Sequence, residues 1–169
     1  LDMVLTKTRH SLRQDSRRTV LFKLGAAALT LVTVSGTSAC AREKSGADIV
    51  YKTPTCGCCT AWTEHLKSSG FDFRIVSLDD LSPIRKQLGA PADLASCHIA
   101  TIGGYVVEGH VPADAIRQLL EERPDAVGVF VPGMPLGSPG MESRYPAQAF
   151  DVILLKKDQS RMVFRSYGP

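Results

Sequence analysis

The sequence "YKTPTCGCCTAWTEHL", residues 51 to 66, places Cys56, Cys58 and Cys59 within four consecutive positions. Cys56 and Cys59 have the C-x-x-C spacing of a thiol–disulfide redox pair, and Cys58 is an additional thiol between them. An apolar run precedes the cysteines, and a segment with helical periodicity follows them. This arrangement predicts a buried strand, a turn that carries the thiols, and then a helix.

The segments around this stretch predict alternating strands and helices. The apolar run "ADIVYK" and the alternating run "FDFRIVSL" are typical of strands. Between them we expect a helix that starts at Cys59 and ends near Gly70. Trp62 and Leu66 share the apolar face of this helix. A strand–helix–strand unit of this kind implies two parallel strands.

The rest of the chain completes a mixed sheet. We expect Ser82 to cap a short helix, and we expect a hairpin in "CHIATIGGYVVEGH" that turns at Gly103 and Gly104. A further helix runs from Pro112 to Pro124, a loop rich in glycine and proline follows, and "FDVILLKKDQSRMVFRSY" indicates a closing hairpin. This order predicts an α/β fold, a thioredoxin-like mixed sheet flanked by helices, with an added C-terminal hairpin.

Residues 1–41 have the features of an export leader. They contain six of the 20 Lys and Arg residues and only two acidic residues, and an apolar run from Leu24 to Val34 is followed by small residues. This order of basic, apolar and small regions is that of an export signal, and the apolar run is too short for a permanent transmembrane helix. Because "SRRTVL" resembles the twin-arginine motif, a twin-arginine leader and an ordinary secretory leader both remain open.

The end of the leader allows two kinds of processing. The small residues "ACA" fit cleavage after Ala41, whereas "TSAC" could be a lipoprotein site that acylates Cys40. We favour simple cleavage because Thr37 stands where lipoproteins usually have leucine. We therefore expect a short linker at 42–48, a single domain at 49–169 and a periplasmic or otherwise exported protein, with lipid anchoring through Cys40 as the alternative.

The charge of the predicted domain argues against nucleic-acid binding. The whole chain has a formal charge of +3, but from residue 42 onward it has 14 basic and 15 acidic residues, a net charge of −1. A nearly neutral domain without a basic stripe or a recognition helix is not typical of a nucleic-acid-binding protein. We therefore expect no nucleic-acid partner, and no permanent transmembrane helix in the mature chain.

Four cysteines remain after the leader, and they are Cys56, Cys58, Cys59 and Cys97. In an oxidising compartment an even number normally indicates disulfides, but this spacing fits them poorly. A Cys58–Cys59 bridge would join sequence neighbours, and a Cys56–Cys58 bridge would close a very tight ring. Only Cys56–Cys59 is a natural local pair, and it leaves two thiols over. The set therefore indicates another occupant.

The motifs "YKTPTCGCC", "ASCHIATIGGYVVEGHVPA" and "VPGMPLGSPGM" together resemble the exported, thioredoxin-like CopG family of copper-resistance proteins. The resemblance covers the whole predicted domain. It implies that copper is bound by the Cys-x-Cys-Cys motif and a distal cysteine, which here are Cys56, Cys58, Cys59 and Cys97. Where thioredoxins have a cis-proline before the third core strand, this chain reads "ASCH". That difference weakens an interpretation as pure disulfide exchange.

The chemistry of these residues agrees with that implication. A helix N-terminus stabilises thiolates, and crowded thiolates need a cation to neutralise them. Soft sulfur ligands select Cu(I), with zinc as the alternative. Met134 and Met141 add thioethers in the glycine- and proline-rich loop, which we expect to return over the cysteines as a lid. Ordinary loop packing is the other explanation for both methionines.

The histidines near these cysteines receive different predictions. Adjacent strand residues point to opposite faces, so we expect His98 to face away from a site that contains Cys97. His110, just before the third helix, is either an extra ligand or a surface residue. His65 and Trp62 are predicted to be structural.

The combined prediction is an exported copper-binding protein of copper resistance that holds Cu(I) in a cysteine-rich site and takes part in its redox chemistry or transfer. One alternative is a periplasmic thiol–disulfide oxidoreductase that uses Cys56 and Cys59, with Cys58 or Cys97 as the resolving thiol. Another is a module that delivers metal to a copper efflux or chaperone protein. The extra cysteines favour the copper site over pure disulfide exchange, and whether its redox activity is catalytic stays open.

Overall fold

The structure, a computed structural model, describes residues 47–168. The predicted leader at 1–41, with its cleavage and acylation sites, and residues 42–46 of the predicted linker lie outside these residues. Within the described residues, no helix is long and apolar enough to cross a membrane.

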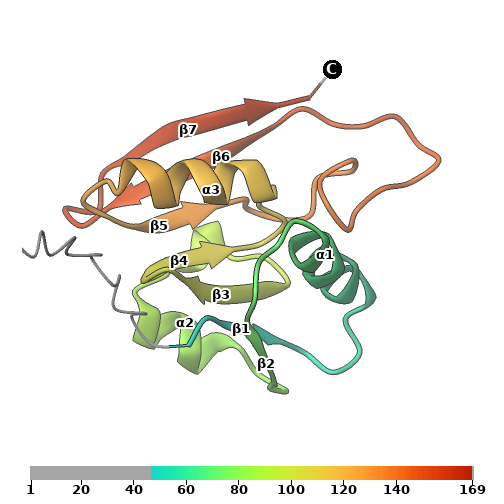
Figure 1. The fold of residues 1–169 in the computed structure, drawn as a ribbon, viewed down its shortest axis with the longest axis horizontal. Helices are drawn as coiled ribbons and strands as arrows, with labels where there is room; N and C mark the ends of the chain where they lie inside the picture. Colours follow the sequence, from blue (N-terminus) through green and yellow to red (C-terminus); the bar gives the residue numbers. More distant parts are fainter. Residues whose placement is uncertain (1–46, 169) are drawn as a thin grey trace, which may run out of the picture. The chain divides into compact units, whose positions relative to one another are not determined.

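In this part of the chain, seven strands form a single mixed sheet with helices packed against it (Figure 1). The order of strands across the sheet is β2-β1-β3-β4-β5-β6-β7. In chain order the elements are β1 (Ile49–Lys52), α1 (Gly57–Ser68), β2 (Arg74–Ser77), α2 (Ser82–Leu88), η1 (Ala92–Leu94), β3 (His98–Ile102), β4 (Tyr105–Glu108), α3 (Ala113–Glu122), β5 (Ala126–Phe130), β6 (Phe150–Lys156) and β7 (Arg161–Tyr167). The predicted α/β mixed sheet, flanked by helices and extended by a C-terminal hairpin, is confirmed.

Alternating side chains of the central strands build two apolar faces. On one face, four buried side chains form a row across the sheet and pack with residues of α1 and α3. The row consists of Val50, Ala100, Val107 and Val129. On the other face, Ile99 and Phe130 pack with Ile84 and Leu88 of α2. Helices α1 and α3 therefore cover one face, and α2 covers the other.

Helix α1 begins earlier than the sequence predicts. Its first residue is Gly57, and Cys56 is the N-cap, whose Sγ accepts a hydrogen bond from the backbone N–H of Cys59 at 3.3 Å. The predicted start at Cys59 is wrong by two residues because a sulfur cap is not among the usual N-cap signals. As a result Cys58 lies in the first turn of the helix. The predicted apolar face is confirmed, since Trp62 is fully buried.

The cap of α2 also differs from the prediction. The helix begins at Ser82, and Ser82 does not cap it through its own side chain. Instead, the backbone N–H of Ser82 donates to Asp80 Oδ1 at 2.8 Å. An aspartate two residues earlier thus takes the role that the sequence analysis gave to the serine.

Strand β5 was not predicted. Its sequence "AVGVF" is a short apolar run without polar alternation, so its periodicity does not distinguish a strand from a segment of buried helix. It pairs in parallel with β4 and antiparallel with β6, and it thereby joins the predicted hairpin of β6 and β7 to the main sheet. Gly128 allows this pairing, because a Cβ at that position would lie 1.8 Å from the carbonyl oxygen of Val106.

The closing hairpin is anchored to α3. The ring of Tyr167 in β7 stacks on Phe150 in β6, with ring centroids 5.2 Å apart. The Tyr167 hydroxyl donates to Asp114 Oδ1 of α3 at 2.7 Å. The hairpin is therefore part of the same packed unit as the sheet and α3.

We expect Gly128→Ala to lower the free energy of unfolding by about 1–3 kcal/mol, because the added methyl group must push β4 and β5 apart. Urea unfolding followed by circular dichroism measures this change. Gly57→Ala is the matched control, because Gly57 has open space around its Cβ position and lies in a helix. The control should match the wild type or gain about 0.4–1 kcal/mol. Wild-type stability in the Gly128 variant would contradict the close approach of the two strands.

Candidate metal centre

The cysteines gather at one edge of the sheet. Strand β3 runs antiparallel to both β1 and β4, and β4 is parallel to β5, so β1, β4 and β5 end at the edge where β3 begins. The N-terminus of α1 follows β1 directly, and Cys97 immediately precedes β3. The topology therefore brings the Cys-x-Cys-Cys motif and the distal cysteine to the same place.

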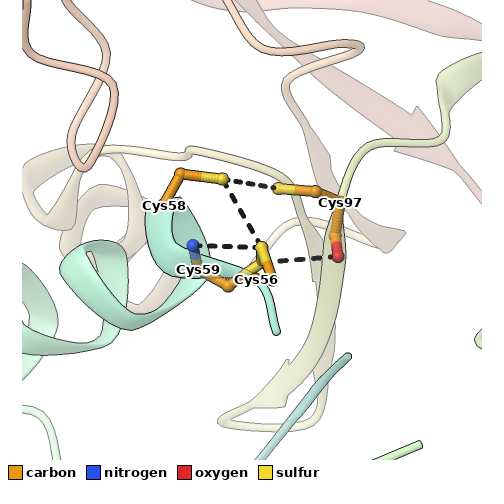
Figure 2. A group of neighbouring side chains, drawn as sticks. All are labelled: Cys56, Cys58, Cys59 and Cys97. Carbon is orange, nitrogen blue, oxygen red and sulfur yellow. Dashed lines mark hydrogen bonds between the residues drawn. A yellow bond between two sulfur atoms is a disulfide. The ribbon is translucent and has the colours of Figure 1, made fainter. Parts of the chain in front are cut away.

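Four side chains form the cysteine cluster, and they are Cys56, Cys58, Cys59 and Cys97 (Figure 2). Their Sγ atoms all lie within 4.8 Å of one another. Cys58 Sγ is 3.4 Å from Cys56 Sγ and 3.7 Å from Cys97 Sγ. Figure 2 shows Cys97 facing the start of α1, with the sulfur of Cys58 pointing toward that of Cys97 and with Cys56 and Cys59 beside Cys58.

Two of these cysteines are joined to each other. Cys56 and Cys59 form a disulfide, whereas Cys58 and Cys97 are free thiols. This is the pairing that the spacing identified as the natural local one. In this redox state the cysteine cluster offers two thiols, and reduction of the disulfide would raise that number to four.

Cys97 lies in a bend just before β3 and is partly buried. Burial, followed by the nearby Cys58, raises the pKa of the Cys97 thiol to about 12. At neutral pH Cys97 therefore keeps its proton unless a cation replaces it.

Two buried histidines also face Cys97. His98 Nδ1 lies 3.3 Å and His110 Nε2 lies 3.1 Å from Cys97 Sγ. The prediction that His98 faces away is wrong, because strand alternation applies only within a strand and Cys97 lies in the preceding bend. The surface role considered for His110 is also wrong, since its side chain is fully buried. Cys97, His98 and His110 form a second donor group, here called the histidine set.

Both imidazoles of the histidine set are neutral at neutral pH. Burial, with His110 nearby, lowers the pKa of His98 to about 3, and burial also lowers the pKa of His110. His110 Nδ1 lies 2.8 Å from the carbonyl oxygen of Pro139, which can only accept a hydrogen bond. His110 therefore carries its proton on Nδ1 and presents the lone pair of Nε2 to Cys97.

The ring of His98 is held by packing. Its centroid lies 4.2 Å from that of Trp62, and within the described part of the chain its buried Nε2 has no hydrogen-bond partner. A buried nitrogen without a hydrogen-bond partner lowers the free energy of unfolding, so His98 is an unfavourable residue for the fold at a position beside the cysteine cluster.

The predictions for Trp62 and His65 agree with their contacts. Trp62 Nε1 donates to the carbonyl oxygen of Val111 at 2.9 Å and fixes α1 to the segment before α3. His65 Nε2 accepts a hydrogen bond from the backbone N–H of Ala113 at 3.2 Å, which satisfies a free donor at the N-terminus of α3. Both side chains are engaged in holding helices together.

The loop that contains the two methionines returns to the cysteine edge. Pro139 contacts His110, and Gly140 lies so close to α1 that a Cβ there would be 2.7 Å from the carbonyl oxygen of Cys58. Met134 is 52% exposed, and Met141 is partly buried. The backbone of the loop therefore covers the start of α1, and a ligand role for either methionine stays a prediction.

The chain matches a family model and solved structures of known proteins. A family model described as "Protein of unknown function, DUF411" matches residues 94–141, and no curated protein sequence matches the chain. A solved structure of the copper resistance protein CopG, form 1, is 41% identical, with a TM-score of 0.68 over 73% of this chain and 98% of that chain. This chain belongs to the CopG family. CopG form 2 is also 41% identical, with a TM-score of 0.66 over 72% of this chain and 97% of that chain.

The sequence analysis considered His110 as an extra ligand but did not place it with His98 beside Cys97, although the CopG-family hairpin carries a signal for that placement. In the hairpin of β3 and β4, Ile99 is the partner of Glu108. Continuing this antiparallel register by two residues places Cys97 opposite His110. Counting outward from the Gly-Gly turn would thus have put His110 beside the distal cysteine.

We expect Cys97 to react slowly with alkylating agents. Its pKa of about 12 is three units above the ordinary value of 9.0, so near pH 8 its thiolate fraction is about a thousandfold lower than that of an ordinary cysteine. Peptide-resolved mass spectrometry after timed exposure to iodoacetamide should show a rate that still rises above about pH 10, with glutathione as the reference thiol. A rate that levels off below about pH 10 would contradict the raised pKa.

Proposed function

We propose that this chain binds copper as Cu(I) and holds it at the cysteine cluster as the cargo of a copper-resistance system. The observation that carries the proposal is the meeting of four cysteine sulfurs and two buried imidazoles around Cys97. The similarity to proteins named copper resistance protein CopG supports copper as the metal.

The kinds and number of donor atoms favour Cu(I) over zinc. Thiolate and thioether ligands are soft and suit Cu(I), and neutral imidazole suits copper as well. A structural zinc site normally uses four ligands in a tetrahedron. The cysteine cluster and the histidine set together offer six donors, and Cys97 belongs to both groups. Such a surplus around a shared sulfur suits several Cu(I) ions bridged by thiolate better than one zinc ion.

The disulfide makes the proposed binding dependent on redox state. While Cys56 and Cys59 are joined, only Cys58 and Cys97 can become thiolates. Two electrons and two protons from a cellular thiol reductant convert the disulfide to two thiols, and Cu(I) can then replace their protons. We infer that the reduced chain holds more copper than the oxidised chain.

Export and transfer belong to the same proposal. We propose that the mature chain works in the periplasm, or otherwise outside the cytoplasm, and passes copper to an efflux or chaperone protein. Cys58 and Cys97 are only partly buried, which supports exchange of the metal with a partner.

We expect serine at Cys56, Cys59 or Cys97 to lower the affinity for Cu(I) by at least about a hundredfold. Mutating residues that only orient metal ligands already lowers metal affinity about 10–100-fold. Cys58→Ser should have a smaller effect, because the C-x-x-C pair can still hold an ion. The fold should survive in all four variants, because apolar packing rather than metal holds the sheet and helices together. Anaerobic titration of the reduced chain with Cu(I) and Zn(II), with metal counting, measures the first effect and circular dichroism the second.

Two histidine variants compare a histidine beside Cys97 with one away from the cysteines. His110→Asn should weaken Cu(I) binding, whereas His65→Asn should not, because His65 bonds to Ala113 and not to the cysteines. Wild-type affinity in the Cys97 variant, or an apo chain without secondary structure, would refute the proposal.

A thiol–disulfide oxidoreductase is the second candidate function, and the disulfide at the N-terminus of α1 favours it. In that reaction a substrate dithiol becomes a disulfide, while Cys56 and Cys59 take up the two electrons and two protons. Copper-free chain should then oxidise a reduced test protein faster than the Cys56→Ser/Cys59→Ser variant does. Equal rates would leave copper binding as the remaining candidate.

The methionine lid leads to a separate prediction. Because a thioether binds Cu(I) without losing a proton, we expect Met134→Leu/Met141→Leu to release Cu(I) faster near pH 5. Stopped-flow transfer to a Cu(I) chelator measures the rate. Met162→Leu is the control, since Met162 is an exposed methionine of β7 outside the loop. If the double variant and the wild type release copper at the same rate, the methionines only pack the loop.

A further inference from the structure

A buried carboxylate interrupts an apolar row of the sheet. On the face covered by α2, the residues paired across β1, β3, β4 and β5 are Tyr51, Ile99, Glu108 and Phe130. Ile99 and Phe130 belong to the apolar cluster of this face, yet Glu108 between them is fully buried. A buried glutamate at such a position requires a charged partner and hydrogen bonds.

The partner is Arg85 of α2. Its Nε donates to both carboxylate oxygens of Glu108, at 3.0 and 3.2 Å, and its Nη2 lies 2.9 Å from Oε1. Only 17% of the Arg85 side chain is exposed. Burial raises the pKa of Glu108, while Arg85 and the backbone of Ser96 lower it.

Both members of the ion pair also hold the residue before Cys97. Glu108 Oε1 accepts a hydrogen bond from the backbone N–H of Ser96 at 2.8 Å. Arg85 Nη2 donates to the carbonyl oxygen of Ser96 at 2.5 Å. The pair therefore fixes the peptide groups on both sides of Ser96, and the second of them leads into Cys97.

Apart from the ion pair, few contacts hold Ser96 at the start of the bend before β3. Cys97 lies in a bend one residue before β3, so it is opposite His110 by register but is not itself one of the paired residues of the sheet. The Ser96 hydroxyl donates to the carbonyl oxygen of Gly133, and the Gly133 N–H donates to that of Ala95. Gly109 approaches so closely that a Cβ there would lie 2.8 Å from Ser96 Cβ. The ion pair is thus the link between this bend and both α2 and β4.

Stability alone does not account for the pair. Replacing a buried ion pair by apolar side chains of similar size is often neutral or stabilising, because the charges no longer have to leave water. The neighbouring positions in the row are already apolar. The contacts to Ser96 are what an apolar pair could not reproduce.

We propose that Arg85 and Glu108 are positioning residues for the metal centre, which clamp the Ser96 backbone so that the Cys97 sulfur points at the cysteine cluster. This inference rests on the proposed binding of Cu(I). Arg85 and Glu108 act through the position of Cys97 and do not themselves bind the copper.

Two variants test the clamp in the full chain. Arg85→Lys keeps the charge but loses the fork that reaches Glu108 and Ser96 together. Arg85→Met/Glu108→Leu removes the charges and fills the space with apolar atoms, so it should fold even if Arg85→Lys does not. We expect each to lower the affinity for Cu(I) about 10–100-fold, as groups that orient metal ligands commonly do. Arg165→Lys, which alters the exposed ion pair with Asp114, is the control and should bind Cu(I) like the wild type.

Amide hydrogen exchange of the apo chain gives a readout that is independent of copper. In the apolar double variant the Ser96 amide should exchange at least about tenfold faster, while the amides of β4 keep their protection. A folded double variant with weak Cu(I) binding and a rapidly exchanging Ser96 supports the clamp. Wild-type affinity in the double variant overturns it.

The Cys97→Ser variant and the double variant together distinguish a failure of the clamp from a failure of the proposed function. If Cys97→Ser binds Cu(I) as tightly as the wild type, the proposed function fails, and the exchange rate alone then decides about the clamp. An unchanged Ser96 rate in the double variant would overturn the clamp whatever the result for copper.

Discussion

The docking of Trp62 on the sheet sets the distance between the two halves of the cysteine cluster. Its indole N–H donates to Val111, its ring packs on His98, and the backbone of Gly140 lies against its backbone nitrogen. The Trp62 side chain therefore connects α1 to the start of β3 and to the segment before α3, and the Trp62 backbone lies against the loop after β5. Because Cys58 lies one helical turn from Trp62 and Cys97 is next to His98, any shift of this indole would move the thiols of α1 relative to the distal thiol.

Buried polarity is concentrated near this edge. The two apolar faces of the sheet contain few polar groups. Near the candidate metal centre, where β1 and β4 end and β3 begins, the buried polar residues are Lys52, His98, Glu108 and His110. Each of these residues costs desolvation that an apolar residue would not. Such local departures from a well-packed core are expected at functional sites.

Much of the fold could be predicted from the sequence, because α1, α3 and the two hairpins have strong periodicity or turn signals such as Gly103-Gly104. Strand β5 could not, since "AVGVF" has no alternation and its place depends on a close approach at Gly128. Of the candidate site, the spacing identified the thiols and the local disulfide pair. It misjudged His98, because the exact start of β3 decides which way that residue points. The contacts of Arg85 with Ser96 join residues distant in sequence, and no local pattern indicates them.

The raised pKa of Cys97 also affects how the chain withstands oxidants. Peroxide reacts with the thiolate form of cysteine, and the first product, a sulfenic acid, can be oxidised further to irreversible forms. A thiol that remains protonated is a poor target for this damage. Cys58 and Cys97 are the free thiols among the described residues, and Cys97 is shared by both donor groups. Its protonation therefore slows oxidation of the sulfur that both donor groups share.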